Sequence, residues 1–349
     1  MATTRVGIIG TGGIAEFQGF AYAKVSNAKI EAVCDIDAGL AEKRAKQWGC
    51  SKVYTDYHQL LKDPEIDAVE ILLPHQLHRQ VVIDAAEAGK HISVMKPMAL
   101  NAADSKEMIA AARKAGVILN VSECYLFYEP ISRAIEMVKS GELGAPMMIR
   151  MERVPFYDGE IKASGFPDTW RSDKKKSGGM VFDDISHYDP VARFLLQSDI
   201  EYVSALLDKP AAAYEIPSLA IWKHKGGPKY GDLAYSWIVR SKMPTDYYGL
   251  HESVEVICER GVIWIPNISG KLLNQAPLVV HKEGNTTSYL NIKADYGDSF
   301  RGEVQHFIDS IQNGTAPIFN GEQGLQQVLF CAAIQKSGEE SRVVRLTEV

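Results

Sequence analysis

Short apolar runs and segments with helical periodicity alternate through the first 121 residues of the chain. A continuous apolar run bounded by turn residues predicts a buried strand, and apolar positions that recur every three to four residues predict a helix packed on one face. Strands are expected at residues 6–9, 29–34, around 53, 68–73, 91–95 and 117–121. Helices are expected at residues 14–25, 39–48, 57–62, 77–88 and 102–115. Alternation of this kind indicates a parallel, doubly wound α/β sheet.

The pattern changes after residue 124, where short strand signals follow one another without intervening helices. These strands are expected at residues 146–153, 202–207, 232–240, 253–258 and 262–265, with helices at 131–140 and 300–312. Such a series is typical of a large, mainly antiparallel open sheet in an α+β domain. We therefore expect two domains, residues 1–124 and residues 125–349.

The first strand-to-helix junction, VGIIGTGGIA, has the spacing of a Rossmann dinucleotide-binding loop. In such a loop Gly10 allows a tight turn, Gly12 lets a pyrophosphate approach the backbone, and the small Ala15 lets helix and strand pack closely. The next strand ends at Asp35, 20 residues after Ala15. An acid there suits an adenosine ribose, although an ordinary turn residue is the alternative. The next two residues supply no cation for a ribose phosphate, so the pattern favours NAD over NADP.

Ligands of an open α/β sheet bind beyond the carboxyl ends of its strands. The residues expected at those ends are Gly10 to Gly13, Asp35, Pro74, His75, Lys96, Pro97 and Glu123 to Tyr125. A lysine is usually a solvated surface charge. At this edge of the sheet, however, Lys96 can hydrogen-bond a substrate hydroxyl or exchange a proton with it.

A second chemical motif lies in the segment WRSDKKKSGGMVFDDISHYDP. Gly178 and Gly179 are expected to open a helix on which Asp183 and His187, four residues apart, share a face. A carboxylate beside an imidazole orients the ring and stabilises its protonated form, as a general base requires; a surface pair is the alternative. Asp184 is either an additional hydroxyl-binding group or a sign that the register of the motif is shifted by one residue.

Composition and charge restrict the function further. Hydrophobic residues make up 46% and charged residues 23% of the 349 residues, as in soluble globular enzymes. The net charge is −6 and no basic block is present, so nucleic acid is not an expected partner. No apolar run reaches membrane-spanning length, so a membrane is not an expected partner either. We expect a cytoplasmic protein, because the chain enters its first strand without a targeting segment. The five cysteines lack metal or disulfide spacing, and His75 and His78 have no third ligand at suitable spacing, so no metal site is expected.

Together these motifs resemble the Gfo/Idh/MocA oxidoreductases, the family of glucose-fructose oxidoreductase and inositol dehydrogenase. The resemblance rests on GTGGIA, Asp35, ILLPHQLH, AGKHISVMKPMAL and the GG-xxx-D-xxx-H pattern, and it extends over nearly the whole chain. It implies NAD as cofactor and a homodimer or homotetramer formed through the second-domain sheet. Met95 stands where family members usually carry a glutamate.

The motifs and the resemblance together define the candidate site. The cofactor-binding residues are expected to be Gly10, Gly12, Gly13, Ile14, Asp35, Ile36, Leu73, Pro74, His75, His78, Met95, Lys96 and Tyr125. The substrate-binding residues are expected to be Lys96, Tyr125, Phe127, Trp170, Arg171, Asp183, Asp184 and His187. Of these, Lys96, Asp183 and His187 are the expected catalytic residues.

The resemblance implies an NAD-dependent dehydrogenase that takes a hydride from a secondary ring hydroxyl of a sugar, glycoside or cyclic polyol. In that reaction His187, supported by Asp183, removes the hydroxyl proton while Lys96 holds the oxygen. An aromatic cluster suits stacking on a sugar or an aglycone and makes the 3-position of a glycoside a candidate site of oxidation; it comprises Tyr125, Phe127, Phe156, Tyr157 and Trp170. Two alternatives remain, a redox-neutral NAD-dependent glycosidase and a non-catalytic sugar or nucleotide sensor.

Overall fold

The computed structural model describes residues 3–154, 170–208, 218–236, 250–270, 272 and 274–349. The chain divides into two compact units, and each is described by itself. The first unit comprises Met1–Cys124 and Gly297–Val328, and the second comprises Tyr125–Tyr296 and Leu329–Val349. The sequence predicts residues 125–349 as one domain, whereas the structure places Gly297–Val328 with the first unit because α10 (Tyr296–Asn313) packs on α1 (Ile14–Tyr22). The stacked rings of Phe17 and Phe300, with centroids 5.1 Å apart, mark that contact.

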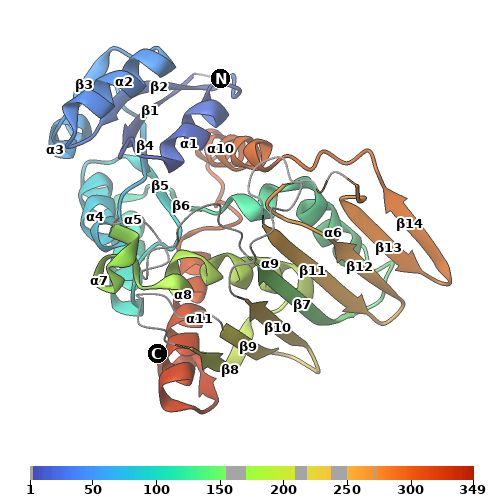
Figure 1. The fold of residues 1–349 in the computed structure, drawn as a ribbon. Coiled ribbons are helices and arrows are strands. Elements are labelled where there is room, and N and C mark those ends of the chain that lie inside the picture. The colour runs from blue at the N-terminus through green and yellow to red at the C-terminus, as the bar shows by residue number, and fades with distance from the viewer. Residues whose placement is uncertain (1–2, 155–169, 209–217, 237–249, 271, 273) are drawn as a thin grey trace, which may run out of the picture. The chain divides into compact units, whose positions relative to one another are not determined.

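The first unit contains a six-stranded sheet in the order β3-β2-β1-β4-β5-β6. Every pair of neighbouring strands in it is parallel, as predicted (Figure 1). The strands are β1 (Thr4–Ile9), β2 (Ala28–Cys34), β3 (Lys52–Tyr54), β4 (Ala68–Ile71), β5 (His91–Met95) and β6 (Leu119–Ser122). The intervening helices are α1, α2 (Ala38–Trp48), α3 (Tyr57–Leu61), α4 (His78–Glu87) and α5 (Ala102–Ala115).

Local sequence explains where these helices begin and end. The side chain of Asp37 accepts a hydrogen bond from the backbone N–H of Leu40 at the start of α2, and Asn101 accepts one from Asp104 at the start of α5. Such caps satisfy N–H groups that have no partner inside the helix. Gly116 ends α5 in the left-handed conformation, which glycine adopts without a steric cost.

A buried polar network lies within the first unit, between the sheet and helices α1 and α10. Glu70 of β4 accepts hydrogen bonds from the hydroxyls of Tyr22 (2.9 Å) and Ser93 (3.0 Å). Glu303 of α10 accepts from Asn120 (3.1 Å), Ser122 (2.8 Å) and Gln18 (3.2 Å). Burial raises the pKa of the Glu303 carboxyl to about 7 and raises that of Glu70 well above its ordinary value.

The second unit contains a nine-stranded sheet in the order β14-β13-β12-β11-β7-β10-β9-β8-β15. Neighbouring strands are antiparallel except β7 and β10, which are parallel, so the predicted mainly antiparallel sheet is confirmed. The strands are β7 (Pro146–Val154), β8 (Ile200–Leu207), β9 (Ser218–His224), β10 (Tyr230–Tyr235), β11 (His251–Cys258), β12 (Gly261–Ile265), β13 (Leu278–Lys282), β14 (Asn285–Tyr289) and β15 (Val344–Arg345).

Helices cover one face of this sheet. Helix α6 (Glu129–Lys139) contacts β12, and α9 (Tyr188–Leu196) contacts β7. On the opposite face β8 and β9 expose apolar side chains: Leu206 is 71%, Leu219 45% and Ile221 54% exposed. Leu206 and Leu219 are direct cross-strand neighbours. Helix α11 (Gly321–Glu340) has residues in both units. No helix in the described part of the chain is long and apolar enough to cross a membrane.

Candidate active site

The glycine loop after β1 has the backbone that its sequence predicts. Gly10 has φ +94°, and a Cβ atom at this position would lie 2.5 Å from the carbonyl oxygen of Leu72, so only glycine fits. Added Cβ atoms at Gly12 and Gly13 would meet no atom within 4 Å. The loop is therefore closed toward the sheet at Gly10 and open at Gly12 and Gly13, as a pyrophosphate-binding loop requires.

Asp35 is fixed beside this loop. Its Oδ2 accepts hydrogen bonds from the backbone N–H (2.7 Å) and the hydroxyl (2.9 Å) of Thr11, and its Oδ1 accepts one from the N–H of Asp37 (3.0 Å). The neighbouring Ile36 is 95% exposed. The buried Arg44 donates to the carbonyl oxygen of Thr11 (3.2 Å) and braces the loop. An oriented carboxylate next to an exposed apolar side chain fits the ribose and base of an adenosine.

His78 joins the segments that follow β4 and β5. Its ring nitrogens lie 2.8 Å from the carbonyl oxygen of Leu73 and 3.0 Å from that of Pro97. Burial lowers the pKa of His78, and its side chain is completely buried. The sequence predicts His78 among the cofactor contacts, but a buried ring can act on a cofactor only through the segments that it joins. One of these carries Lys96, which is linked to Pro97 by a cis peptide bond.

The remaining predicted residues of the first unit lie at the same edge of the sheet. Pro74 precedes a 3₁₀ turn at His75–Leu77, and His75 is 4% exposed. Met95 is the last residue of β5 and, like Lys96, is half-buried. These positions follow the carboxyl ends of β4 and β5, where the sheet binds ligands.

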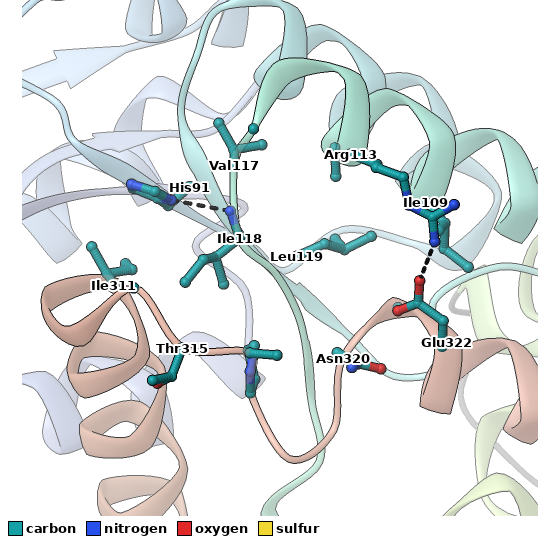
Figure 2. Close-up of a pocket in the computed structure, with 16 residues that line it drawn as sticks. His91, Ile109, Arg113, Val117, Ile118, Leu119, Ile311, Thr315, Asn320 and Glu322 are labelled. Carbon is teal, nitrogen blue, oxygen red and sulfur yellow. Dashed lines mark hydrogen bonds and ion pairs between the residues drawn. The ribbon is translucent and has the colours of Figure 1, made fainter.

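A cavity of about 320 Å³ lies elsewhere in the first unit (Figure 2). Its wall includes residues at the amino ends of β5 and β6 and part of the segment between α10 and α11. Arg113 and Glu322 form an ion pair (2.8 Å) on this wall, and the Ile118 N–H donates to His91 Nδ1 (3.1 Å). Because ligands of such sheets bind at the carboxyl ends of the strands, we do not assign this cavity to the candidate site.

In the second unit, the motif that contains Asp183 and His187 is not one helix, so that prediction is wrong. The chain forms α8 (Met180–Asp183), a 3₁₀ turn at Ile185–His187, and then α9. Asp184 breaks the helix with φ −126° and ψ −47°. Pro190 explains the restart, because proline has no N–H for the interior of a helix but is tolerated in the first turn of α9. The spacing of four residues therefore does not place Asp183 and His187 on one helical face.

Asp183 is held by Arg171, a cation from the same motif. Its Oδ1 accepts from Arg171 Nε (3.2 Å), and the Asp183 side chain is 11% exposed. The Arg171 guanidinium lies 4.5 Å from the centre of the Trp170 ring. Trp170, Arg171 and Phe127 are half-buried, whereas Phe156 and Tyr157 lie outside the described residues.

Asp184, the residue between α8 and the following 3₁₀ turn, has two structural partners. It forms an ion pair with Arg153 Nε (2.5 Å) and accepts a hydrogen bond from the hydroxyl of Tyr235 (2.6 Å). The sequence offers Asp184 as a hydroxyl-binding group, but these contacts engage its carboxylate inside the protein. Burial opposes the charge of Arg153, yet Asp184 and Glu252 raise its pKa well above the ordinary value.

His187 is 8% exposed, and its ring stacks on that of Tyr125 with centroids 4.3 Å apart and an angle of 11° between the planes. The Tyr125 hydroxyl lies 3.1 Å and 3.2 Å from the two oxygens of Glu252. Glu252 also accepts from the hydroxyl of Tyr188 (2.5 Å) and from Arg153 (2.8 Å). Burial raises the pKa of both tyrosines well above the ordinary value, so they remain donors.

Four residues of this set were not predicted from the sequence: Arg153, Tyr188, Tyr235 and Glu252. One signal was present: the alternation in HESVEVIC places Glu252 on the same strand face as Val254 and Val256, where a carboxylate is unusual. Among the described residues, no group of three or more histidine, cysteine, aspartate or glutamate side chains has a geometry that could hold a metal ion.

Two models of one family match this chain. "Oxidoreductase family, NAD-binding Rossmann fold" matches residues 4–123, and "GFO/IDH/MocA C-terminal domain" matches residues 131–264. The myo-inositol 2-dehydrogenase of Thermotoga maritima is 28% identical over 354 residues, which cover 99% of both chains. The scyllo-inositol 2-dehydrogenase (NAD(+)) of Bacillus subtilis is 29% identical over 325 residues, covering 90% of this chain and 88% of that protein.

Solved structures show the same fold. A probable dehydrogenase from Thermotoga maritima has a TM-score of 0.82 at 26% identity and covers 99% of both chains. Levoglucosan dehydrogenase in complex with NADH and levoglucosan has a TM-score of 0.85 at 20% identity, again over 99% of both chains. Because the two family models together account for more than half of the residues, the chain belongs to the Gfo/Idh/MocA family of oxidoreductases, and its first unit carries the NAD-binding Rossmann domain.

Proposed function

We propose that this protein oxidises a secondary ring hydroxyl of a cyclic polyol or sugar, with bound NAD⁺ as the hydride acceptor. The curated relatives described above are named inositol 2-dehydrogenases. The observation that carries the proposal is His187, which is 8% exposed and stacked on Tyr125 in the segment that also carries Asp183. An imidazole held in one orientation suits a general base.

The proposed contacts with the pyrophosphate and the adenosine follow from the first unit alone. The open loop at Gly12 and Gly13 and the start of α1 at Ile14 would hold the pyrophosphate. Asp35 would accept hydrogen bonds from the adenosine ribose, and the exposed side chain of Ile36 would be covered by the adenine. For the nicotinamide half we propose Leu73, Pro74, His75, Met95 and Lys96, together with Tyr125 of the second unit.

The proposed reaction converts a secondary alcohol into a ketone. His187 takes the hydroxyl proton, and the carbon–hydrogen bond of the same carbon breaks with its electron pair as hydride. Lys96 hydrogen-bonds the oxygen and stabilises its developing negative charge. Asp183, which Arg171 holds in place, is the residue proposed to support His187 in this step.

Two finer points belong to the same proposal. The half-buried rings of Phe127 and Trp170 suit stacking on the apolar face of a sugar, which supports a glycoside oxidised at its 3-position. The exposed apolar side chains of Leu206, Leu219 and Ile221 suit an interface between copies of this chain, as a homodimer or homotetramer.

The test is NADH formation, followed by absorbance, with NAD⁺ and a panel of myo-inositol, scyllo-inositol, levoglucosan, glucose and an aryl glucoside. Lys96→Ala and His187→Ala should each lower kcat by at least about 100-fold, as expected for the loss of a group that acts on the transferred proton or its oxygen. Lys106→Ala and His281→Ala, at positions outside the proposed site, are the matched controls and should keep the parent activity.

Two results would overturn the dehydrogenase assignment. Aglycone released from the aryl glucoside without net NADH would identify a redox-neutral glycosidase. Tight NAD binding without turnover of any compound would identify a sensor.

A further inference from the structure

A set of buried polar side chains in the second unit connects the sheet to His187. We propose that Tyr125, held by Glu252, is a positioning residue that fixes the imidazole of His187 and stabilises the charge it gains on taking up a proton. This inference rests on the proposed function, since it assigns a partner to the proposed base. All the residues that carry it belong to the second unit.

The rings of Tyr125 and His187 are stacked. The Tyr125 and His187 planes differ by 11°, and their centroids are 4.3 Å apart. Tyr125 is only 3% exposed, and the edge of Tyr296 contacts it with ring centroids 6.1 Å apart. These contacts fix the orientation of the Tyr125 ring, and the fixed ring in turn fixes the plane of the His187 imidazole.

A single carboxylate, that of Glu252, anchors both the ring stacked on His187 and the residue that follows His187 in the chain. Glu252 accepts hydrogen bonds from Tyr125, whose ring covers His187, and from Tyr188, which follows His187 in the chain. Glu252 has no exposed surface, and Arg153 fixes it from the neighbouring strand at 2.8 Å. The ring and the backbone of His187 therefore share one anchor.

The charges around Tyr125 support the same role. Glu252 and Asp184 face the single cation Arg153 within this set, so the set carries one net negative charge. A phenol that donates to a carboxylate has an electron-rich ring, and the face of such a ring attracts a cation. The arrangement thus favours the charged imidazole, which forms only when His187 accepts the proton. Loss of the Glu252 anchor, which has no exposed surface, should lower kcat and leave the KM for substrate and the affinity for NAD⁺ unchanged.

The test compares variants that remove the anchor, the hydroxyl and the ring in turn. Tyr125→Phe keeps the ring but loses one hydrogen bond, and should lower kcat about fivefold. Glu252→Gln keeps the shape but removes the charge, and should lower kcat about tenfold. Tyr125→Leu removes both stacking and hydrogen bond and should lower kcat about fiftyfold. Matched controls are Tyr289→Leu on β14 and Glu255→Gln, three residues from Glu252 on the opposite face of β11.

Activity is measured with myo-inositol first, and then with the panel compound that the parent protein oxidises fastest. A second readout needs neither cofactor nor substrate: the NMR signal of the His187 ring, identified by its loss in His187→Ala. Shielding by the stacked phenol should shift this signal in the parent protein. The shift should persist in Tyr125→Phe and disappear in Tyr125→Leu.

The outcomes separate this inference from the proposed function. If His187→Ala is inactive but Tyr125→Leu and Glu252→Gln match the parent, the positioning role is wrong and the dehydrogenase assignment stands. If His187→Ala is fully active, the assignment of the base is wrong. A His187 signal that does not change in Tyr125→Leu, or a loss of kcat accompanied by an equal rise in KM and a lower melting temperature, would also overturn the inference.

Discussion

The carboxyl group of Glu303 should make the stability of the first unit depend on pH. Glu303 lies on α10 and is 1% exposed. Burial raises its pKa to about 7, although Ser122, Gln18 and Asn120 donate hydrogen bonds that favour the charged form. In the unfolded chain the same carboxyl titrates near its ordinary pKa of 4.5. Between these two values the folded protein holds a proton that the unfolded chain releases.

This difference fixes both the sign and the size of the effect. Because the folded state binds more protons, the free energy of unfolding falls as the pH rises from about 4.5 to about 7 and then levels off. At about 1.4 kcal/mol for each pKa unit, the whole loss is about 3 kcal/mol. His224 of the second unit has the opposite slope, since burial lowers its pKa to about 4 and its folded form binds fewer protons. The effect of Glu303 is therefore isolated by comparing the parent with a Glu303 variant and by measuring the stability of the first unit alone.

Glu303→Gln is the appropriate perturbation, because an amide has a similar shape and no charge at any pH. The substitution also replaces an acceptor of three hydrogen bonds. Each donor left without a partner should lower the free energy of unfolding by about 1 kcal/mol at every pH. The difference in unfolding free energy between variant and parent should therefore move by about 3 kcal/mol in favour of the variant between pH 4.5 and pH 8. Glu70→Gln should change in the same direction, because the pKa of Glu70 is also raised by burial.

Hydrogen–deuterium exchange of peptides from β4 and β6 measures the opening free energy of this unit separately from the second. Rates at each pH are corrected for the intrinsic pH dependence of amide exchange, and parent and variant are compared at the same pH. A difference between Glu303→Gln and the parent that stays constant from pH 4.5 to pH 8 would refute the reasoning, whatever its absolute size.

Two further perturbations test the glycine loop and the exposed sheet face. Gly10→Ala should lower the free energy of unfolding by at least about 2 kcal/mol and weaken NADH binding. The reason is that φ is +94° and the new Cβ would lie 2.5 Å from the Leu72 carbonyl oxygen. An unchanged melting temperature together with an unchanged NADH fluorescence titration would contradict this prediction. Ile221→Glu should dissociate a dimer or tetramer formed through β8 and β9, as measured by light scattering, whereas Leu290→Glu, 65% exposed after β14, should leave the mass unchanged. An equal mass for the parent and Ile221→Glu would exclude that face as the interface.

The architecture of the first unit could be predicted because its signals are local. Strands β1 and β4 are almost completely buried and contain short apolar runs, and helices α2, α3 and α5 each begin at a side-chain cap. The backbone at Gly10 was predictable for the same reason, since a glycine was needed where strand turns into helix. The membership of residues 297–328 was not predictable, because it depends on packing between Phe17 and Phe300, far apart in the sequence.

Strands of the second unit were predicted less completely. Strand β14 has the sequence NTTSY, which has no apolar alternation because the strand lies at the edge of the sheet with most of its side chains exposed. The break in the helix at Asp184 was not predicted, because the spacing of the motif suggests a continuous helix. Tertiary contacts of Asp184 favour a different backbone conformation at this position. The ion pair to Arg153 and the hydrogen bond from Tyr235 hold the Asp184 carboxylate, and neither partner lies within the motif.

The same distinction applies to the candidate site. Lys96 and His187 could be proposed from the sequence because each lies next to residues that shape the backbone locally. Glu252 could not, because its importance comes from register: it is the cross-strand neighbour of Arg153, 99 residues earlier in the chain. Antiparallel pairing of β7 and β11 brings these opposite charges together at one rung, and that rung holds Tyr125 and Tyr188. A slip of one residue in this pairing would turn Glu252 to the other face of the sheet and remove the anchor from His187. In this protein the geometry of the proposed base is therefore a property of the sheet register, which is why a motif search finds the base and not its support.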